Sequence, residues 1–235
     1  MHGFRFTSIT NSIKAFFFRI IEKILSFNTD IFITINNEDY NFAKSQLFKR
    51  SLCYKINGVG LNPIIKHLKK IIKKKQKIKK ILVIAAYKKE KGYLDILEVA
   101  AILKNQKIKI ECYGDGDHHK FDSIKIKKKL HNISFKKFDI NLKNKIKNFD
   151  ILLHLSKREG LPVAVMQALS EGLPIICYNI RGNNDLVKDK FNGYLINSYK
   201  DVLGRIFYLN MEDGLFDKMR INAFKSINKD FTEKR

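Results

Sequence analysis

The sequence predicts an α/β protein built on a doubly wound parallel sheet, and three observations lead to this class. From residue 81 onward, short apolar runs alternate with amphipathic stretches of helical length. Such alternation is typical of strand–helix–strand units, whose parallel strands are covered on both faces. Hydrophobic residues make up 45% and charged residues 29% of the 235 residues, as in a globular protein. The length allows one complete domain of this kind, preceded by part of a second Rossmann-like domain.

The first part of the chain predicts a helix and two strands. In residues 13–25 apolar side chains recur at helical spacing, and the other side of this helix carries Lys14, Arg19, Glu22 and Lys23. This apolar stripe favours packing against a sheet, and the alternative is a helix that lies on a membrane surface. Residues 30–35 and 52–56 are predicted strands, joined by a short helix over residues 38–46.

Basic residues are in large excess, with 46 Lys and Arg against 23 Asp and Glu and a formal net charge of +23. This charge favours anionic partners: nucleic acid, an acidic membrane surface or phosphorylated ligands. The chain is also rich in Lys, Ile, Asn and Phe and has no Trp, as an AT-rich coding sequence would give, so many lysines also fit solvated faces without a function. The densest run, residues 66–80, fits a solvated linker and helix face or a contact with anionic lipid. It contains no Phe, Tyr or Trp, which argues against nucleic-acid binding by base stacking.

The remainder of the chain alternates strands with helices. Strands are predicted over residues 81–87, 107–113, 133–138, 151–156 and 175–180, and helices over residues 93–105, 123–130, 142–149, 199–210 and 212–228. The glycines of Gly114-Asp-Gly116-Asp117 are a weak signal and fit a turn after a strand.

Residues 159–194 organise this part of the chain. The strand 151–156 leads into Glu159-Gly-Leu-Pro162, and the proline is predicted to be the first residue of a helix, where its fixed φ is suitable and its missing N–H costs nothing. Gly172-Leu-Pro174 ends that helix before the next strand. The helix N-terminus therefore lies at the carboxyl edge of a parallel sheet. Free N–H groups and the helix dipole favour negative charge there, which predicts a phosphorylated ligand.

The same residues resemble the C-terminal, donor-binding domain of family-four retaining glycosyltransferases, which have the two-domain B-type fold. The family pattern is an acidic residue and G-x-P, a second acidic residue eight positions after the first, another G-x-P, a Gly-bearing loop and an N-G-hydrophobic turn. The matching residues are Glu159, Gly160, Pro162, Gly172, Pro174, Gly182, Asn192 and Gly193.

The resemblance covers essentially the whole chain and implies three parts. Residues 1–58 resemble a remnant of the N-terminal, acceptor-side domain, and residues 59–215 resemble the C-terminal nucleotide-sugar donor-binding domain. Residues 216–235 are expected to form a closing helix that leans back toward the N-terminal part. Asn57-Gly-Val-Gly60 matches the crossing between the two domains.

Two charged site residues follow from the resemblance. Glu159 matches the acidic residue that lies against the donor sugar, and it is the candidate catalytic residue. Lys91, beside Gly92 at the mouth of a helix, matches the lysine that contacts the diphosphate. Without the resemblance, Lys91 would be one more surface lysine and Glu159 an exposed helix-capping carboxylate.

The other donor-binding candidates are Gly160, Val163, Ala164 and Gln167. The backbone at Val163 and Ala164, in the first turn after the proline, would face the phosphates. Gln167 stands where the family has the second acidic residue, which holds the ribose hydroxyls. An amide still forms hydrogen bonds but lacks the charge, so weaker donor binding is expected.

Two further features depart from the family pattern. The basic residue that usually precedes the lysine by five positions falls on Ala86, although Lys88 or Lys89 could substitute. Loss of one cation from a diphosphate clamp costs roughly a few kcal/mol at the transition state. The family's first strands and its glycine-rich acceptor-side loop have no counterpart, so the chain resembles a glycosyltransferase truncated at the N-terminus. His2 is the candidate match for a histidine of the acceptor-side cleft.

Several titratable residues are expected to be structural. Because adjacent histidines point apart, no metal site is expected at His118 and His119 with Asp115 and Asp117, and the family mechanism uses no metal. His154, inside an apolar strand, is interpreted as a core residue with satisfied hydrogen bonds rather than a base. Cys53, Cys112 and Cys177 are interpreted as small core residues in a reducing compartment. No signal peptide and no membrane span are expected.

The predicted function is transfer of a hexose-type sugar from a nucleoside diphosphate sugar, with UDP-sugar favoured, to a polysaccharide or lipid-linked saccharide with retention of configuration. No cofactor and no metal are expected. The expected location is cytoplasmic or peripheral at the inner face of the membrane, with an anionic membrane surface and a separate N-terminal half as further partners and no nucleic acid. Two alternatives remain: a catalytically incompetent nucleotide-sugar-binding fragment that needs a partner chain, or a basic protein that binds nucleic acid or membrane surfaces.

Overall fold

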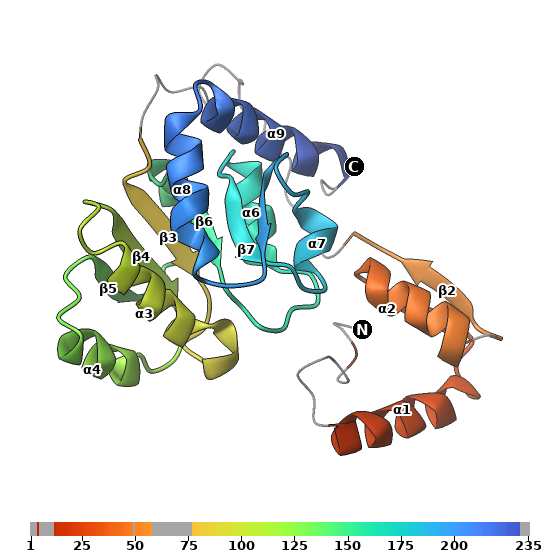
Figure 1. Ribbon diagram of the computed structural model, residues 1–235. Coiled ribbons are helices and arrows are strands. Elements are labelled where there is room, and N and C mark those ends of the chain that lie inside the picture. The colour runs from red at the N-terminus through yellow and green to blue at the C-terminus, as the bar shows by residue number, and fades with distance from the viewer. Residues whose placement is uncertain (1–3, 5–11, 49, 58–76, 231–235) are drawn as a thin grey trace.

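The computed structural model describes Phe4 and residues 12–48, 50–57 and 77–230 (Figure 1). They form two parts: a small N-terminal unit, residues 4 and 12–57, and a large domain, residues 77–230. The predictions for His2 and for most of the basic run at residues 66–80 lie outside the described residues.

The large domain contains, among its described residues, a six-stranded sheet in the order β5-β4-β3-β6-β7-β8 with every pairing parallel. The strands are β3 (Lys80–Ile84), β4 (Lys109–Gly114), β5 (Ile133–Lys137), β6 (Ile151–His154), β7 (Ile175–Tyr178) and β8 (Gly193–Ile196). The strand order reverses between β3 and β6, which defines a doubly wound sheet. The predicted fold class is therefore confirmed.

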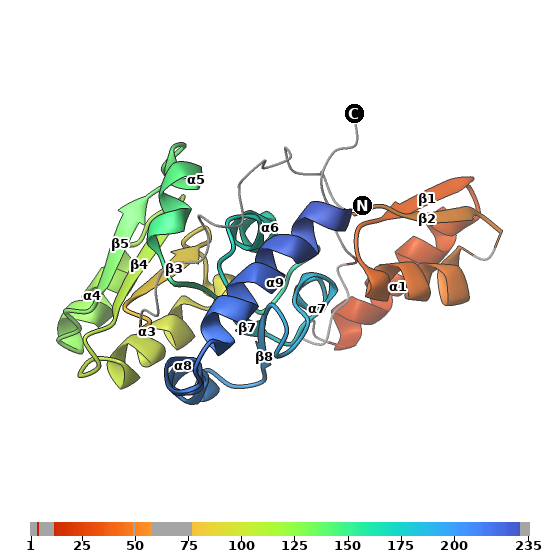
Figure 2. The ribbon, with the colours of Figure 1, turned by 90° about the horizontal axis from the view of Figure 1, so that it is seen from above.

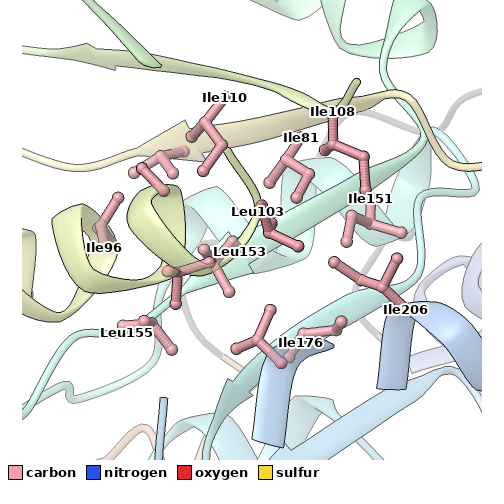
Figure 3. Packing of buried hydrophobic residues seen from close by; sticks show 14 of the residues in the cluster. Ile81, Ile96, Leu103, Ile108, Ile110, Ile151, Leu153, Leu155, Ile176 and Ile206 are labelled. Atoms are coloured by element: carbon pink, nitrogen blue, oxygen red, sulfur yellow. The ribbon is translucent and has the colours of Figure 1, made fainter. Parts of the chain in front are cut away.

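Helices cover both faces of this sheet. One face carries α3 (Tyr93–Ile102), α4 (His119–Lys127) and α8 (Asp201–Met211). The other carries α5 (Leu142–Lys145), α6 (Val163–Ser170), α7 (Asn183–Leu186) and α9 (Leu215–Asp230). Successive strand residues point to opposite faces, so Ile81 and Val83 lie in the first layer and Leu82 in the second. Figure 3 shows the first layer, where isoleucines of β3, β4, β6 and β7 pack beside Ile96 and Leu103.

The helix expected to close the chain belongs to the outer layer of the large domain. α9 packs along α6. Arg220 donates from Nε to the Gly172 carbonyl oxygen at 3.4 Å, and Asn192 donates from Nδ2 to the Ser226 hydroxyl at 3.0 Å. Figure 2 shows that its C-terminal end points toward the N-terminal unit.

Most predicted elements are present, with three differences. Pro162 is the N-cap residue, with an extended backbone (φ −76°, ψ 114°), and α6 begins one residue later than predicted. α4 begins at His119, before the predicted start at Ser123. The short elements α7 and β8 were not predicted, because four residues carry too little periodicity to distinguish them from the surrounding loop.

The N-terminal unit is a short β–α–β arrangement preceded by a helix. It contains α1 (Ser12–Ser26), β1 (Ile31–Thr34), α2 (Asn37–Phe42), a π-helical turn (Ala43–Leu47) and β2 (Leu52–Lys55). β1 and β2 pair in parallel. Their inner face packs around Phe4 and Phe48, and the rings of Phe32 and Phe48 stack with centroids 3.9 Å apart.

The apolar stripe of α1 does not pack against a sheet, and the prediction that favoured this was wrong. Ala15 and Phe18 contact the small core, whereas the opposite side of the helix is exposed. This α1 outer face consists of Phe16, Phe17, Ile20, Ile21, Ile24 and Leu25, whose exposed fractions lie between 39% and 62%. The β1–β2 outer face, formed by Ile31, Leu52 and Tyr54, is also exposed. Parallel strands are normally covered on both faces, so an exposed β1–β2 outer face is unusual for this fold.

Two smaller expectations can be compared with the described residues. Cys112 and Cys177 are buried, as predicted for core residues, whereas Cys53 is half-buried, and all three are free thiols. None of the described helices combines the length and apolar character needed to cross a membrane.

Candidate functional site

A cavity of about 290 Å³ lies at the carboxyl ends of β3, β4 and β6. This is the crevice beside the point where the strand order reverses, which is where doubly wound sheets bind ligands. Its lining residues are Ile84, Ala85, Ala86, Lys91, Tyr113, Gly114, Asp115, Phe138, Leu142, His154, Glu159, Pro162, Val163 and Ala164. The cavity therefore contains four of the six residues proposed from the sequence for the donor site.

Lys91 reaches this cavity because a glycine follows it. The 3-10 turn Lys89–Lys91 follows β3 and ends at Gly92, which has a φ of +77°. A Cβ atom at Gly92 would lie 1.9 Å from the Leu155 carbonyl oxygen, a separation that no real Cβ adopts. Glycine therefore allows this turn to approach the end of β6 closely.

Three charged or polar side chains meet on one wall of the cavity. The Lys91 Nζ lies 2.7 Å from Glu159 Oε1, and the His154 Nε2 lies 3.2 Å from the same oxygen. Side-chain exposure falls from 25% at Lys91 through 11% at Glu159 to 4% at His154. The carboxylate therefore lies between an ammonium that faces the cavity and an imidazole that comes from the core.

The pKa of Glu159 shows how strongly these neighbours act on it. Burial by itself raises the pKa of the Glu159 carboxyl, but the adjacent His154 ring, together with the charge and hydrogen bond of Lys91, lowers it to about 2. Glu159 is therefore an anion throughout the physiological pH range.

His154 was misjudged from the sequence. It is buried, as predicted for a residue of an apolar strand, but its ring contacts Glu159 and it lines the cavity. The signal that could have found it is its place as the last residue of β6, since the carboxyl ends of parallel strands meet at the ligand-binding edge.

The N-terminus of α6 forms the neighbouring wall. Val163 and Ala164 line the cavity, and N–H groups in the first turn of a helix have no partner within that helix. Gln167 lies one turn further along α6 and does not line the cavity. Gly160 does not line it either, because its carbonyl oxygen faces the N-terminal unit.

The far side of the cavity is less polar. Ala86 lines it, and neither Lys88 nor Lys89 does, so the suggested substitute cation is not at the cavity wall. Phe138 is 69% exposed and also lines the cavity. It lies just after β5, the edge strand of the sheet, and offers a flat apolar surface.

A second cavity of about 270 Å³ lies at the boundary between the two parts of the chain. It is lined by Glu38, Lys157, Arg158, Glu159, Asn179, Ile180, Arg181 and Asn184. Both cavities share Glu159. The loop that carries this residue therefore separates a cavity in the large domain from a polar cavity that faces the N-terminal unit.

Side chains from both parts of the chain hold this loop. Arg181 donates from Nε to the Glu159 carbonyl oxygen at 3.3 Å, and Asn36 donates from Nδ2 to the Gly160 carbonyl oxygen at 3.1 Å. Arg181 and Asp39 form an ion pair across the boundary, with 2.6 Å between Nη1 and Oδ1. None of these three residues was proposed from the sequence, because their partners are distant in the chain.

The histidine cluster lies outside both cavities. His118 Nδ1 is 2.5 Å from Asp122 Oδ2, and one ligand atom each of His118, His119 and Asp122 lie within 4.8 Å of one another. The expectation that these adjacent histidines point apart was therefore wrong. The hydrogen bond between His118 and Asp122 gives this arrangement a structural explanation, and the absence of a metal stays a prediction.

Comparison with known proteins connects this site to a family. A family model described as "Glycosyl transferases group 1" matches residues 65–225. A Bacillus subtilis protein named "Putative glycosyltransferase EpsD" is 28% identical over 209 residues, and the match covers 83% of this chain and 55% of that protein. The UDP-Gal:alpha-D-GlcNAc-diphosphoundecaprenol alpha-1,3-galactosyltransferase of Escherichia coli is 27% identical over 214 residues, and the match covers 83% of this chain and 54% of that protein. The chain thus spans about half the length of these curated relatives.

Solved structures agree on the fold. A mutant of S. aureus TarM, in complex with fondaparinux, alpha-GlcNAc-glycerol and UDP, matches with a TM-score of 0.81 at 19% identity, over 99% of this chain and 47% of that one. The pneumococcal O-GlcNAc transferase GtfA, in complex with UDP and GlcNAc, matches with a TM-score of 0.73 at 19% identity, over 92% of this chain and 44% of that one. The resemblance drawn from the motif around Glu159 is confirmed, and the chain belongs to the family of group 1 glycosyl transferases.

Proposed function

We propose that this chain binds a nucleoside diphosphate sugar in the cavity at the switch point. In this proposal it contributes to retaining transfer of a hexose-type sugar to a polysaccharide or lipid-linked saccharide. The observation that carries the proposal is the Lys91–Glu159 pair, which joins the loops after β3 and β6 beside the N-terminus of α6. An ammonium and free helix N–H groups suit a diphosphate, and a carboxylate suits the hydroxyls of a sugar.

The Lys91 Nζ lies 2.7 Å from Glu159 Oε1. A bound diphosphate would compete for the same ammonium and neutralise part of its charge, leaving the Glu159 carboxylate to accept hydrogen bonds from the sugar. In the transfer, the bond from the anomeric carbon to the diphosphate oxygen breaks and a bond to the acceptor hydroxyl oxygen forms. The hydroxyl proton leaves with the nucleoside diphosphate. Lys91 and the first turn of α6 would stabilise the charge that develops on the leaving group, without a metal ion.

UDP is the proposed nucleotide, and Phe138 the proposed contact for its base. The E. coli relative is named for a UDP-Gal donor, and both structures compared above contain UDP. A base that lies against the exposed ring of Phe138 would place the diphosphate toward Lys91, because both side chains line the same cavity. The acceptor saccharide would enter through the polar cavity at the boundary, which adjoins Glu159 from the other side.

The test is thermal unfolding of the purified chain with UDP, GDP, UDP-glucose and UDP-galactose. Ligand at about a hundred times its Kd adds about 2.7 kcal/mol to the free energy of unfolding and so raises Tm by several degrees. Lys91→Met should abolish the shift. Lys127→Met, which removes an exposed lysine of α4 outside the cavity, should leave the shift unchanged. Gln167→Glu should enlarge it if the amide weakens ribose binding.

Three outcomes of these binding experiments have different meanings. A shift with one nucleotide that depends on Lys91 would support the donor site. No shift with any nucleotide would overturn the proposal and leave glycosyl transfer as the ancestry of the chain rather than its activity. Binding that falls steeply with salt and ignores Glu159→Ala would instead favour a basic nucleic-acid- or membrane-binding protein.

A second candidate is a nucleotide-sugar-binding subunit that needs a separate polypeptide for the acceptor side. It is favoured by the exposed α1 outer face and β1–β2 outer face. The competing occupant of these faces is an anionic membrane surface. Sedimentation with phosphatidylglycerol vesicles distinguishes them. Vesicle binding that is lost in Phe17→Ser would favour the membrane surface. If the chain neither binds vesicles nor turns over UDP-sugars by itself, the result would favour the partner chain.

A further inference from the structure

Arg181 is a buried arginine at the boundary between the two parts of the chain. It lies in the loop after β7 and is 9% exposed, and its partner Asp39, at the start of α2, is 3% exposed. The Arg181 Nη1 lies 2.6 Å from Asp39 Oδ1, and its Nη2 donates to the Phe4 carbonyl oxygen at 3.1 Å. All three nitrogen atoms of the guanidinium therefore donate hydrogen bonds. Nη1 and Nη2 donate to the N-terminal unit, and Nε donates to the Glu159 carbonyl oxygen.

Asn36 donates a hydrogen bond to the next carbonyl group along the chain, that of Gly160. Asn36 is 1% exposed, and its Nδ2 donates to the Gly160 carbonyl oxygen at 3.1 Å and to Asp39 Oδ2 at 2.8 Å. Asp39 thus connects the arginine and the asparagine. Two consecutive carbonyl groups, those of Glu159 and Gly160, each accept a hydrogen bond from one of these side chains.

The loop is also held by close packing. Gly182, the residue after the arginine, has a φ of +80°, and a Cβ atom there would lie 2.4 Å from the Gly160 carbonyl oxygen. No larger residue fits without moving one of the two loops. The arginine can therefore reach Glu159 because the loop after β7 lies directly against the loop after β6.

We propose that Asn36, Asp39 and Arg181 are positioning residues that hold the Glu159–Gly160 loop from behind, so that the N-terminal unit sets the position of the Glu159 carboxylate in the large domain. The side chain of Glu159 points to Lys91 and His154 while its carbonyl points to Arg181. Displacement of this loop would move the carboxylate away from both partners. The importance of this position for sugar binding rests on the proposed function, but the positioning itself does not.

The boundary also supplies a matched control. The backbone N–H of Asn37 donates to Asp185 Oδ1 at 2.8 Å, so this contact joins the same two parts but touches neither Glu159 nor Gly160. Asp185→Asn replaces the charged acceptor by a neutral amide oxygen and so weakens this contact without releasing the loop. The two roles of Asn36 can also be separated. Its Oδ1 caps α2 by accepting a hydrogen bond from the Asp39 N–H, and its Nδ2 donates to the Gly160 carbonyl oxygen. Asn36→Ser keeps a capping oxygen and loses the amide donor.

The experiment compares Arg181→Met, Asn36→Ser and Asp185→Asn with the parent chain, all checked for folding by circular dichroism. The first readout is the 13C shift of the Glu159 carboxyl between pH 3 and 6, which needs no nucleotide. In the parent and in Asp185→Asn the carboxyl should stay ionised throughout this range. In Arg181→Met and Asn36→Ser it should titrate within the range, because the carboxylate has moved away from Lys91 and His154. Asn36→Ser keeps the test valid if Arg181→Met does not fold.

The second readout is the ratio of UDP-glucose to UDP affinity by calorimetry. Loss of one positioning hydrogen bond should weaken UDP-glucose on the order of tenfold while UDP itself changes little. An unchanged titration of Glu159 in both loop variants would overturn the inference, as would an equal effect in Asp185→Asn. Failure of the parent to bind UDP would overturn the proposed function alone, since the titration still decides the role of the three residues.

Discussion

Gly92→Ala provides a sensitive test of how Lys91 is placed. Two costs follow from the geometry. A residue with a side chain at a φ of +77° loses about 1–2 kcal/mol relative to glycine, and the new Cβ would lie 1.9 Å from the Leu155 carbonyl oxygen. To relieve this contact the Lys89–Lys91 turn must move away from β6. The movement breaks the 2.9 Å hydrogen bond from the Lys157 N–H to the Glu90 carbonyl oxygen, worth about 1 kcal/mol.

The expected total is a loss of about 2–3 kcal/mol in the free energy of unfolding, which for a chain of this size lowers Tm by about 4–12 °C. Urea unfolding followed by circular dichroism measures it. Gly204→Ala is the matched control: Gly204 is the fourth residue of α8, with no atom within 4 Å of an added Cβ, so alanine there should stabilise the protein by about 1 kcal/mol. A Gly92→Ala protein within about 0.5 kcal/mol of the parent would refute the argument that the close approach to Leu155 requires glycine.

Two other substitutions test the charge and the core. Folding lowers the pKa of Glu159 from 4.5 to about 2, which at about 1.36 kcal/mol per unit corresponds to about 3 kcal/mol of stability. Because the folded-state pKa is the lower one, this stability is present above pH 4.5 and is lost as the pH falls toward 2. Glu159→Gln should therefore be less stable than the parent at pH 7 and nearly equal to it at pH 2, whereas Glu90→Gln, at an exposed position, should match the parent in urea unfolding at every pH. Leu153→Ala, at a fully buried position of β6, should lower the free energy of unfolding by about 2–5 kcal/mol in the same assay. A smaller loss would mean that the residues between the sheet and α3 repack to fill the space left by the leucine side chain.

Local patterns were sufficient for much of the large domain. The strands β3, β6 and β7 were predicted because short, mostly apolar runs between turn residues are typical of strands in a buried parallel sheet. Gly172, at a φ of +73°, marked the end of α6 for a similarly local reason. The motif around Glu159 then placed the cavity, since a loop after a parallel strand must lie at the carboxyl edge.

The same patterns were insufficient where burial depends on distant segments. The stripe on α1 has the periodicity of a packed helix, and periodicity alone cannot show that its outer face is exposed. His154 was interpreted as a core residue because its neighbours in the sequence are apolar. Its contact with Glu159 forms only when the loop after β6 brings the two side chains together. Gln167 follows the motif spacing, but the turn of α6 places it away from the cavity wall.

By itself, the amino-acid sequence determined the α/β class, the course of the strands and helices, the family and the positions of Lys91 and Glu159 at one edge of the sheet. These features depend on local backbone preference and on the alternation of buried and exposed residues, and both are visible in short stretches. Only the tertiary structure decided that Arg181 pairs with Asp39, 142 positions earlier in the chain, and that together with Asn36 they hold the Glu159 loop. Such a contact depends on how two parts of the chain pack together, and no local pattern of residues specifies that arrangement.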